Sequence, residues 1–226
     1  MKAMTKRRQS GFSMIELLVV LGIGMILIAM AVPLVSTTLN MYRLRGGGSD
    51  YANLAQTARM RAVTDDRYYE IVNNIGAAPA AGVNAYVNTG TTATGGPVAG
   101  PGYTLGDPAV AFSTKIVIRA QAAGPGLLNL YNQFLPGIAP GAVAINPNAW
   151  DPNAVTFGPR GLPCQATAAT GGTCTYTSNP GALPIAYEVF VQNVVSGVWE
   201  AVTVNPSGRV RQWQYDAAAA RWRPLD

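Results

Sequence analysis

Residues 11–34 read GFSMIELLVVLGIGMILIAMAVPL, an apolar stretch in which Glu16 is the single ionisable side chain. At about 1.5 Å of rise per residue, a helix over residues 12–34 would span the roughly 30 Å of hydrocarbon in a bilayer. Four basic residues and no acidic residue precede this stretch: Lys2, Lys6, Arg7 and Arg8. Because positive charge is retained in the cytoplasm, the pattern predicts one membrane span, with the N-terminus inside and the C-terminus outside.

The apolar stretch could be cleaved as a secretory signal or retained as an anchor. A secretory signal would end in a small-residue cleavage site, but Ala29 and Ala31 lead into Val32 and Pro33, which is a poor match. An uncleaved anchor is the ordinary alternative.

A third interpretation rests on Gly11, Phe12, Glu16 and Pro33. A basic leader, a Gly-Phe junction, a Glu as the fifth residue after the junction and a Pro within the apolar run resemble the N-terminus of type IV prepilins and of type II secretion pseudopilins. The resemblance implies that a prepilin peptidase cuts after Gly11, that Phe12 is then N-methylated, and that the apolar helix is retained.

The same resemblance implies a role for Glu16 in filament assembly. A charge at the centre of a membrane helix costs about 2.5–3.5 kcal/mol and less near an end, so such a group usually has a partner. In pilins that partner is the methylated amino group of a neighbouring subunit, here Phe12. The alternative is a Glu16 that lies at the lipid head groups without a partner.

Charge and cysteine content set limits on the mature chain. Removal of residues 1–11 would lower the net charge from +5 to +1, so any positive patch must be local. Cys164 and Cys174 lie in the part predicted to be outside the cytoplasm, where disulfides form. We expect a bridge between them, which would stabilise the fold by roughly 3 kcal/mol.

The whole chain predicts an α+β fold: a long N-terminal hydrophobic α-helix of the pilin type, then a β-rich globular domain with antiparallel hairpins. Residues 1–11 are the expected leader and 12–34 the transmembrane and filament-core helix. Residues 35–74 are expected to form an amphipathic helical segment, with a break at glycines 46–48 because each glycine weakens a helix by about 1 kcal/mol. The apolar stripe of this segment has three-and-four spacing: Leu44, Tyr51, Leu54, Ala55, Ala58 and Ala62.

The globular domain is expected at residues 75–226. Within it, residues 76–153 are rich in Gly and Pro and predict an insertion made largely of loops, with an edge strand at Tyr86 and a strand at 115–120. Residues 154–163 and 201–213 each read as strand, Pro-x-Gly turn, strand, and 185–193 as the strand between them. These paired hairpins resemble the globular domain of FimT/GspH-like minor pilins and pseudopilins.

The composition excludes most enzyme classes. The chain has no histidine, which removes the usual acid-base and metal-binding side chain. Asp65 and Asp66 adjoin, but neighbours on a helix point about 100° apart, and the glycines lack the lysine of a phosphate-binding loop. We therefore expect no enzymatic activity, no cofactor and no metal.

The C-terminal 20 residues hold four arginines against two aspartates. A strand from Arg209 would place Arg211, Trp213 and Tyr215 on the same face, and arginine with aromatic rings suits nucleic acid. Residues 208–211, Gly-Arg-Val-Arg, also resemble a motif in the DNA-binding C-terminal region of some FimT-like pilins. The candidate DNA-binding residues are Arg209, Arg211, Trp213, Arg221 and Arg223. The alternative is a plain hairpin turn with solvated arginines and a core Trp213.

These observations predict a minor pilin-like subunit of a type IV pilus, with binding of double-stranded DNA for natural transformation as a further role. A type II secretion pseudopilin acting in protein export is the alternative. The expected partners are the prepilin peptidase, other pilins or pseudopilins, and the inner membrane. The expected location is the bacterial inner membrane before assembly, and a pilus or periplasmic pseudopilus afterwards.

Overall fold

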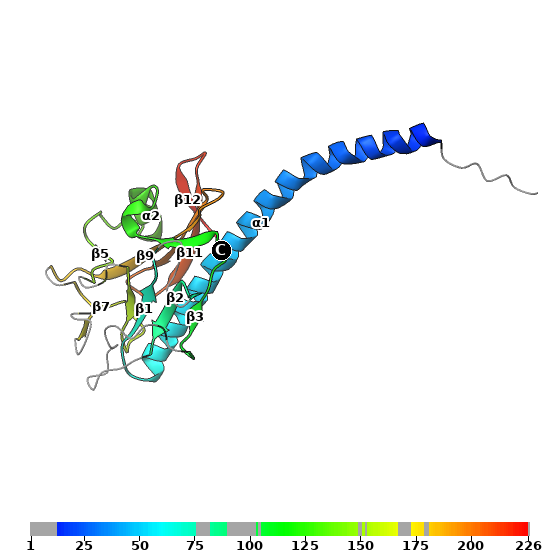
Figure 1. Cartoon of the computed structure of the whole chain (residues 1–226). Coiled ribbons are helices and arrows are strands. Elements are labelled where there is room, and N and C mark those ends of the chain that lie inside the picture. The colour runs from blue at the N-terminus through cyan, green and yellow to red at the C-terminus, as the bar shows by residue number, and fades with distance from the viewer. Residues whose placement is uncertain are drawn as a thin grey trace, which may run out of the picture. The chain divides into compact units, whose positions relative to one another are not determined.

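The structure, a computed structural model, describes residues 13–75, 82–89, 103, 105–148, 151, 153–166, 173–178 and 181–225 (Figure 1). The predicted cleavage junction, Gly11 and Phe12, lies outside these residues. The chain divides into two compact units, Met1–Asn40 and Met41–Asp226. The predicted α+β class is confirmed, since one long apolar helix precedes antiparallel sheets.

The long helix α1 comprises Met14–Thr64. Its apolar part has a mean hydropathy of 2.8 over 18 residues, and none of that window is buried, so by length and composition it can cross a membrane. The helix starts directly after Ser13, whose Oγ accepts a hydrogen bond of 3.2 Å from the Glu16 backbone N–H. This bond satisfies one of the N–H groups that a helix start leaves free.

In the second unit, α1 presents the predicted apolar stripe to the core. All six stripe residues are at most 5% exposed. The break predicted at residues 46–48 is wrong, because α1 continues through all three glycines. The reason is close packing: a Cβ on Gly47 would lie 3.3 Å from the Phe112 ring, and one on Gly48 would collide with the Glu200 carboxylate. Contact with the domain therefore offsets the low helix propensity of glycine.

The described residues of the second unit form three sheets, which are antiparallel apart from one short parallel pairing. The four-stranded sheet has the order β3-β2-β1-β6, and its strands are Ala109–Val110, Ala85–Asn88, Tyr69–Asn73 and Val155–Phe157. The six-stranded sheet has the path β12-β11-β10-β9-β4, made of Arg221–Pro224, Val210–Asp216, Trp199–Val204, Ile185–Asn193 and Ile116–Arg119. Its sixth strand, β5 (Ala144–Ile145), pairs in parallel with β9. A small sheet joins β7 (Gln165–Ala166) and β8 (Cys174–Thr175).

The six-stranded sheet is covered on both faces. One cluster packs α1 against Ile185 and Tyr187 of β9 and Val202 of β10. Alternate residues of the same strands, such as Ala186 and Ala201, pack instead against the short helix α2 (Leu127–Phe134). Because side chains alternate along a strand, β9 is buried on both faces, which explains its nearly continuous apolar sequence.

The sequence predicts a loop-rich segment between residues 121 and 153, but not the short regular elements that this segment contains. That segment forms a 3₁₀ helix η2 (Gln121–Ala123), α2 and β5. Helix α2 follows Gly126 in the left-handed conformation, and it buries Leu130, Tyr131 and Phe134, whose spacing fits one helical face. The strand at Tyr86 is present as β2, but it is not an edge, since β3 pairs with its outer side.

The two predicted Pro-x-Gly hairpins differ in extent. Strands β10 and β11 pair antiparallel, as predicted, whereas the first turn connects β6 to a single bridge between Phe157 and Pro163. The turns touch: a Cβ on Gly208 would lie 2.5 Å from the Gly161 carbonyl oxygen. The same oxygen accepts a hydrogen bond of 2.9 Å from Arg59 Nε, which links α1 to both turns.

The contact between the turns gives a stability prediction. Gly208 has a φ of +77°, and an added Cβ would also meet backbone, so we expect Gly208→Ala to destabilise the protein by about 2–4 kcal/mol, from the φ penalty and overpacking together. Gly197 is the matched control, because its φ is +70° and an added Cβ meets no described atom within 4 Å. Gly197→Ala should cost about 1 kcal/mol. Urea unfolding of the full-length protein in detergent measures both; equal losses would mean that the contact contributes nothing.

Candidate functional site

Of the candidate residues at the N-terminus, Glu16 lies within the part of the chain that the structure describes. This side chain is exposed in the first turn of α1, where a negative charge interacts favourably with the helix dipole. Its pairing with Phe12 of a neighbouring subunit stays a prediction.

The disulfide between Cys164 and Cys174 is confirmed, with 5.5 Å between the two Cα atoms. Cys164 is completely buried, and its carbonyl oxygen accepts a 2.6 Å hydrogen bond from Tyr187 Oη. Its backbone N–H donates to Thr156 on β6. The bridge therefore joins β8 to the segment held against both β6 and β9.

The structure separates the arginines predicted to form one C-terminal site. Arg209 directly precedes β11. Arg221, on β12, lies opposite Asp216 in the strand register, at the other end of β11. Seven residues at about 3.3 Å each put these ends about 23 Å apart. The C-terminal candidate residues therefore belong to two different ends of the domain.

The prediction that Trp213 stacks on a DNA base is wrong, because this side chain is buried. Its side chain is 2% exposed, and its indole N–H donates a 2.8 Å hydrogen bond to Thr203 Oγ1. Trp222 is 1% exposed, with its indole N–H bonded to the Pro125 carbonyl oxygen at 2.9 Å. Both rings belong to the cluster beneath α2. Strand alternation determines which face of β11 carries Trp213. Helix α2, which lies far away in the sequence, covers that face.

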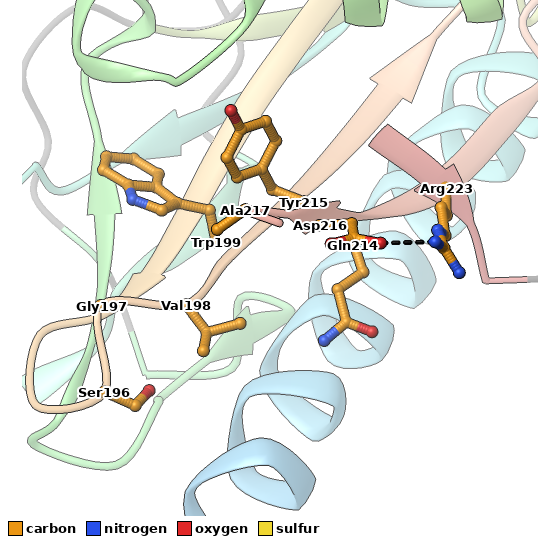
Figure 2. A pocket seen from close by; sticks show the side chains of 9 residues that line it. All are labelled: Ser196, Gly197, Val198, Trp199, Gln214, Tyr215, Asp216, Ala217 and Arg223. Atoms are coloured by element: carbon orange, nitrogen blue, oxygen red, sulfur yellow. Dashed lines mark ion pairs between the residues drawn. The ribbon is translucent and has the colours of Figure 1, made fainter. Parts of the chain in front are cut away.

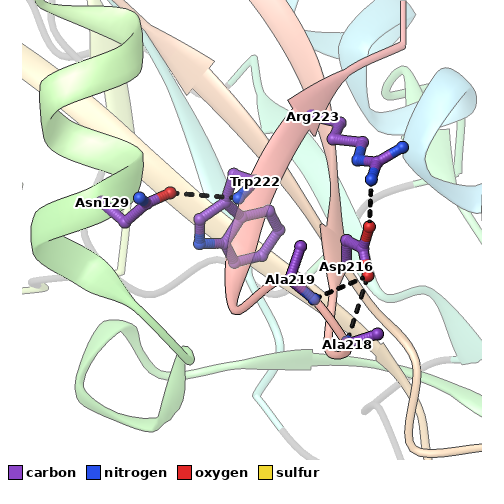
Figure 3. A network of polar contacts seen from close by, with 6 residues as sticks. All are labelled: Asn129, Asp216, Ala218, Ala219, Trp222 and Arg223. Carbon is purple, nitrogen blue, oxygen red and sulfur yellow. Dashed lines mark hydrogen bonds and ion pairs between the residues drawn. The ribbon is translucent and has the colours of Figure 1, made fainter.

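The remaining C-terminal arginines differ in availability. Arg211 is half-buried, and its Nε has no hydrogen-bond partner among the described residues. Arg223 forms an ion pair of 2.5 Å with Asp216 (Figure 3). Asp216 also accepts hydrogen bonds from two backbone N–H groups of the β11–β12 turn, so it both shapes this turn and neutralises Arg223. Arg209 and Arg221 are exposed.

Contact between the two Pro-x-Gly turns creates a basic group that the sequence analysis missed. Arg160 precedes Gly161 and Arg209 follows Gly208, and these glycines touch. Arg59 lies against both turns, and the Arg160 guanidinium lies 5.2 Å from the centre of the Tyr176 ring. We call Arg59, Arg160 and Arg209 the turn-arginine cluster. The sequence does show an arginine beside each turn glycine, but not that the two turns meet.

Comparison with known proteins adds one finding at the N-terminus. A model of the prokaryotic N-terminal methylation motif matches residues 6–32, and the long apolar helix and β-rich domain follow this match. The motif and the architecture are consistent with a type IV pilin-like protein. No curated protein and no solved structure matches the chain. The match includes the predicted junction and Glu16.

Three carboxyl groups are buried in the domain: Glu70, Glu188 and Glu200, each at most 3% exposed. Burial raises the pKa of Glu70 to about 8, with the nearby Asp151 adding to the rise. Burial raises the pKa of Glu188 and of Glu200 to about 7, opposed by the Gln121 hydrogen bond and by Arg45, respectively. Among the described residues, no three His, Cys, Asp or Glu side chains come together as metal ligands.

These carboxyl groups predict how the stability of the protein depends on pH. The folded state binds their protons more tightly than an unfolded chain, in which a glutamate titrates near 4.5. The contribution of these three groups to stability should therefore be greatest below pH 4.5. It should be lost as pH rises through about 7 to 8. The loss is about 1.4 kcal/mol per unit of pKa difference.

Thermal unfolding of the full-length protein in detergent, followed across this pH range, measures the effect. Glu200→Gln should reduce the fall in midpoint between acidic and alkaline pH, because the amide cannot ionise. Asp50→Asn, which removes one exposed carboxylate of the domain, is the matched control. A Glu200→Gln profile that parallels the wild type would contradict the assignment.

Proposed function

We propose that the chain is a FimT/GspH-like minor pilin subunit that enters a type IV pilus and supports its assembly. The observation that carries the proposal is the methylation motif at residues 6–32, which overlaps the exposed apolar part of helix α1. In this proposal residues 1–11 are removed as the leader, 12–34 lie first in the inner membrane and then in the filament core, and the β-rich domain is outside the cytoplasm.

Assembly would depend on the charge of Glu16. An exposed carboxylate among apolar side chains requires a partner once the helix leaves water. The methylated amino group of Phe12 in a neighbouring subunit supplies one of opposite charge. The pair would form in one helix register, so it would both select incoming subunits and set their axial position.

Processing and assembly can be tested in a bacterium that carries a prepilin peptidase. The intact mass of the purified protein should correspond to a chain that begins at Phe12 and carries one extra methyl group. Glu16→Gln should be processed normally but should be lost from sheared filaments, since the change removes the charge and keeps the size. An uncut Met1 would overturn the pilin assignment, and normal incorporation of Glu16→Gln would overturn the role of the charge.

We propose binding of double-stranded DNA, in support of natural transformation, as a second role. The observation that favours it is the turn-arginine cluster, in which Arg160 and Arg209 are both exposed on turns that touch each other. Arginines contact DNA phosphates and release counterions, which makes such binding sensitive to salt. Because the tryptophans are buried, the contact would be to the phosphate backbone and not to unstacked bases.

A salt series on duplex DNA tests this role with two matched pairs. Arg160→Ala/Arg209→Ala should make the slope of log affinity against log salt shallower by about 1.8, at about 0.9 per lost phosphate contact. Arg221→Ala/Arg223→Ala removes the same charge at the other end of β11 and should leave the slope unchanged. No binding by the wild type at moderate salt would exclude the role, and equal effects of the two pairs would exclude the cluster.

A type II secretion pseudopilin acting in protein export is the alternative function. The methylation motif supports a pilin and a pseudopilin equally, because both are processed by the same peptidase. Deletion of the gene separates them: loss of a secreted protein from the medium with normal piliation would favour the pseudopilin.

A further inference from the structure

The end of the domain at which the chain enters from the apolar helix brings several separate segments together. Val194 in the β9–β10 turn donates its backbone N–H to the Lys115 carbonyl oxygen at 2.9 Å. Val198, at the end of the same turn, packs against the cluster that Leu44 of α1 forms with Ile116 and Val191. Arg45 of α1 donates a 3.3 Å hydrogen bond to Gln214 on β11. The start of α1 in this unit and the β9–β10 turn therefore lie at one end.

The β11–β12 turn lies at the same end. Residues of both turns line one hollow of about 380 Å³, among them Ser196, Gly197 and Ala217. Figure 2 shows Val198 and Gln214 on one side of these strands and the rings of Trp199 and Tyr215 on the other. We call the surface formed by residues 42–45, Lys115, residues 194–198 and residues 217–221 the entry face.

The entry face exposes apolar groups at its tips. Val194 is 43% exposed and Val195 is 60% exposed, side by side in a turn. Tyr42 is 67% exposed at the start of the unit. Residues 217–220 are four consecutive alanines, all exposed. A turn in contact with water usually carries polar residues, so this composition indicates an apolar environment.

Basic side chains surround these tips. Arg43, Arg45 and Arg221 are exposed, and Lys115 is half-buried. Asp216 is the acidic side chain of the two turns, and it is paired with Arg223. Glu200, near Arg45, is buried beneath α1. The entry face therefore combines a positive rim with short apolar tips.

We propose that the entry face binds the surface of a bilayer that contains anionic lipid. Basic side chains attract acidic head groups, and exposed Val and Tyr insert at the boundary with the acyl chains. The chain supplies the proximity, since only seven residues lie between Leu34 of the apolar stretch and Tyr42 of the domain. Such a tether raises the effective concentration of the face at the membrane. The proposal goes beyond a role in a filament, because it concerns the subunit while α1 is still in a membrane.

The experiment uses the full chain reconstituted in two kinds of vesicle, phosphatidylcholine alone and phosphatidylcholine mixed with phosphatidylglycerol. Hydrogen exchange of the backbone amides in residues 194–198 and 217–221 should slow several-fold in the anionic vesicles. High salt should remove the difference, because exposed charges are screened. Unchanged exchange in β9 and β10 serves as the control for folding.

Two variants and a matched control locate the effect. Arg43→Glu/Arg221→Glu and, separately, Val195→Asp should each abolish the slowing. Arg160→Glu makes the same kind of charge reversal at the opposite end of the domain and should preserve it. Equal exchange in both vesicles, or slowing that survives Arg43→Glu/Arg221→Glu, would overturn the proposal. Slowing that follows the number of copies per vesicle and not lipid charge would also overturn it, and would assign the face to a second copy of the chain. None of these results depends on processing or on Glu16, so the filament role is tested independently.

Discussion

Close packing of α1 against the six-stranded sheet is the contact on which the rest of the domain depends. Alanine and glycine on the buried side of the helix allow the backbone to approach strands β9 and β10, where Ala55, Ala58 and Gly48 are almost completely buried. This contact keeps α1 helical through three glycines whose own propensity opposes a helix. It also fixes the two ends of the domain, because Arg45 meets β11 near one end and Arg59 meets the turns at the other.

Packing a sheet between two helices places polar groups in the interior, and each group requires a partner or a proton. Asn148 pairs both polar atoms of its amide: Nδ2 donates to the Ala154 carbonyl oxygen and to Thr156 Oγ1 at 3.0 Å, and Oδ1 accepts from the Ala166 N–H at 3.0 Å. Glu200 shows the opposite solution, since both carboxyl oxygens lack hydrogen-bond partners among the described residues. Burial then favours the protonated form, which is why the domain is expected to prefer acidic conditions.

The ends of the domain differ in chemistry because different connections reach them. At one end, the touching turns present arginines beside glycines, with few apolar side chains at their tips. At the other end, the β9–β10 and β11–β12 turns present valine and alanine surrounded by basic residues. A phosphate backbone suits the first surface, where arginines flank the touching turns, and a lipid surface suits the second, where apolar tips have a basic rim.

The sequence by itself determined the features that depend on neighbouring residues. These are the methylation motif, the apolar stripe of α1, strand β9, the β10–β11 hairpin and the disulfide between Cys164 and Cys174, because each follows from local order, periodicity or cysteine content. Only the tertiary structure decided that α1 continues through its glycines, that α2 covers Trp213, and that Arg59, Arg160 and Arg209 share one end. Each of these depends on which distant segment packs against a residue, and a local pattern carries no information about that choice.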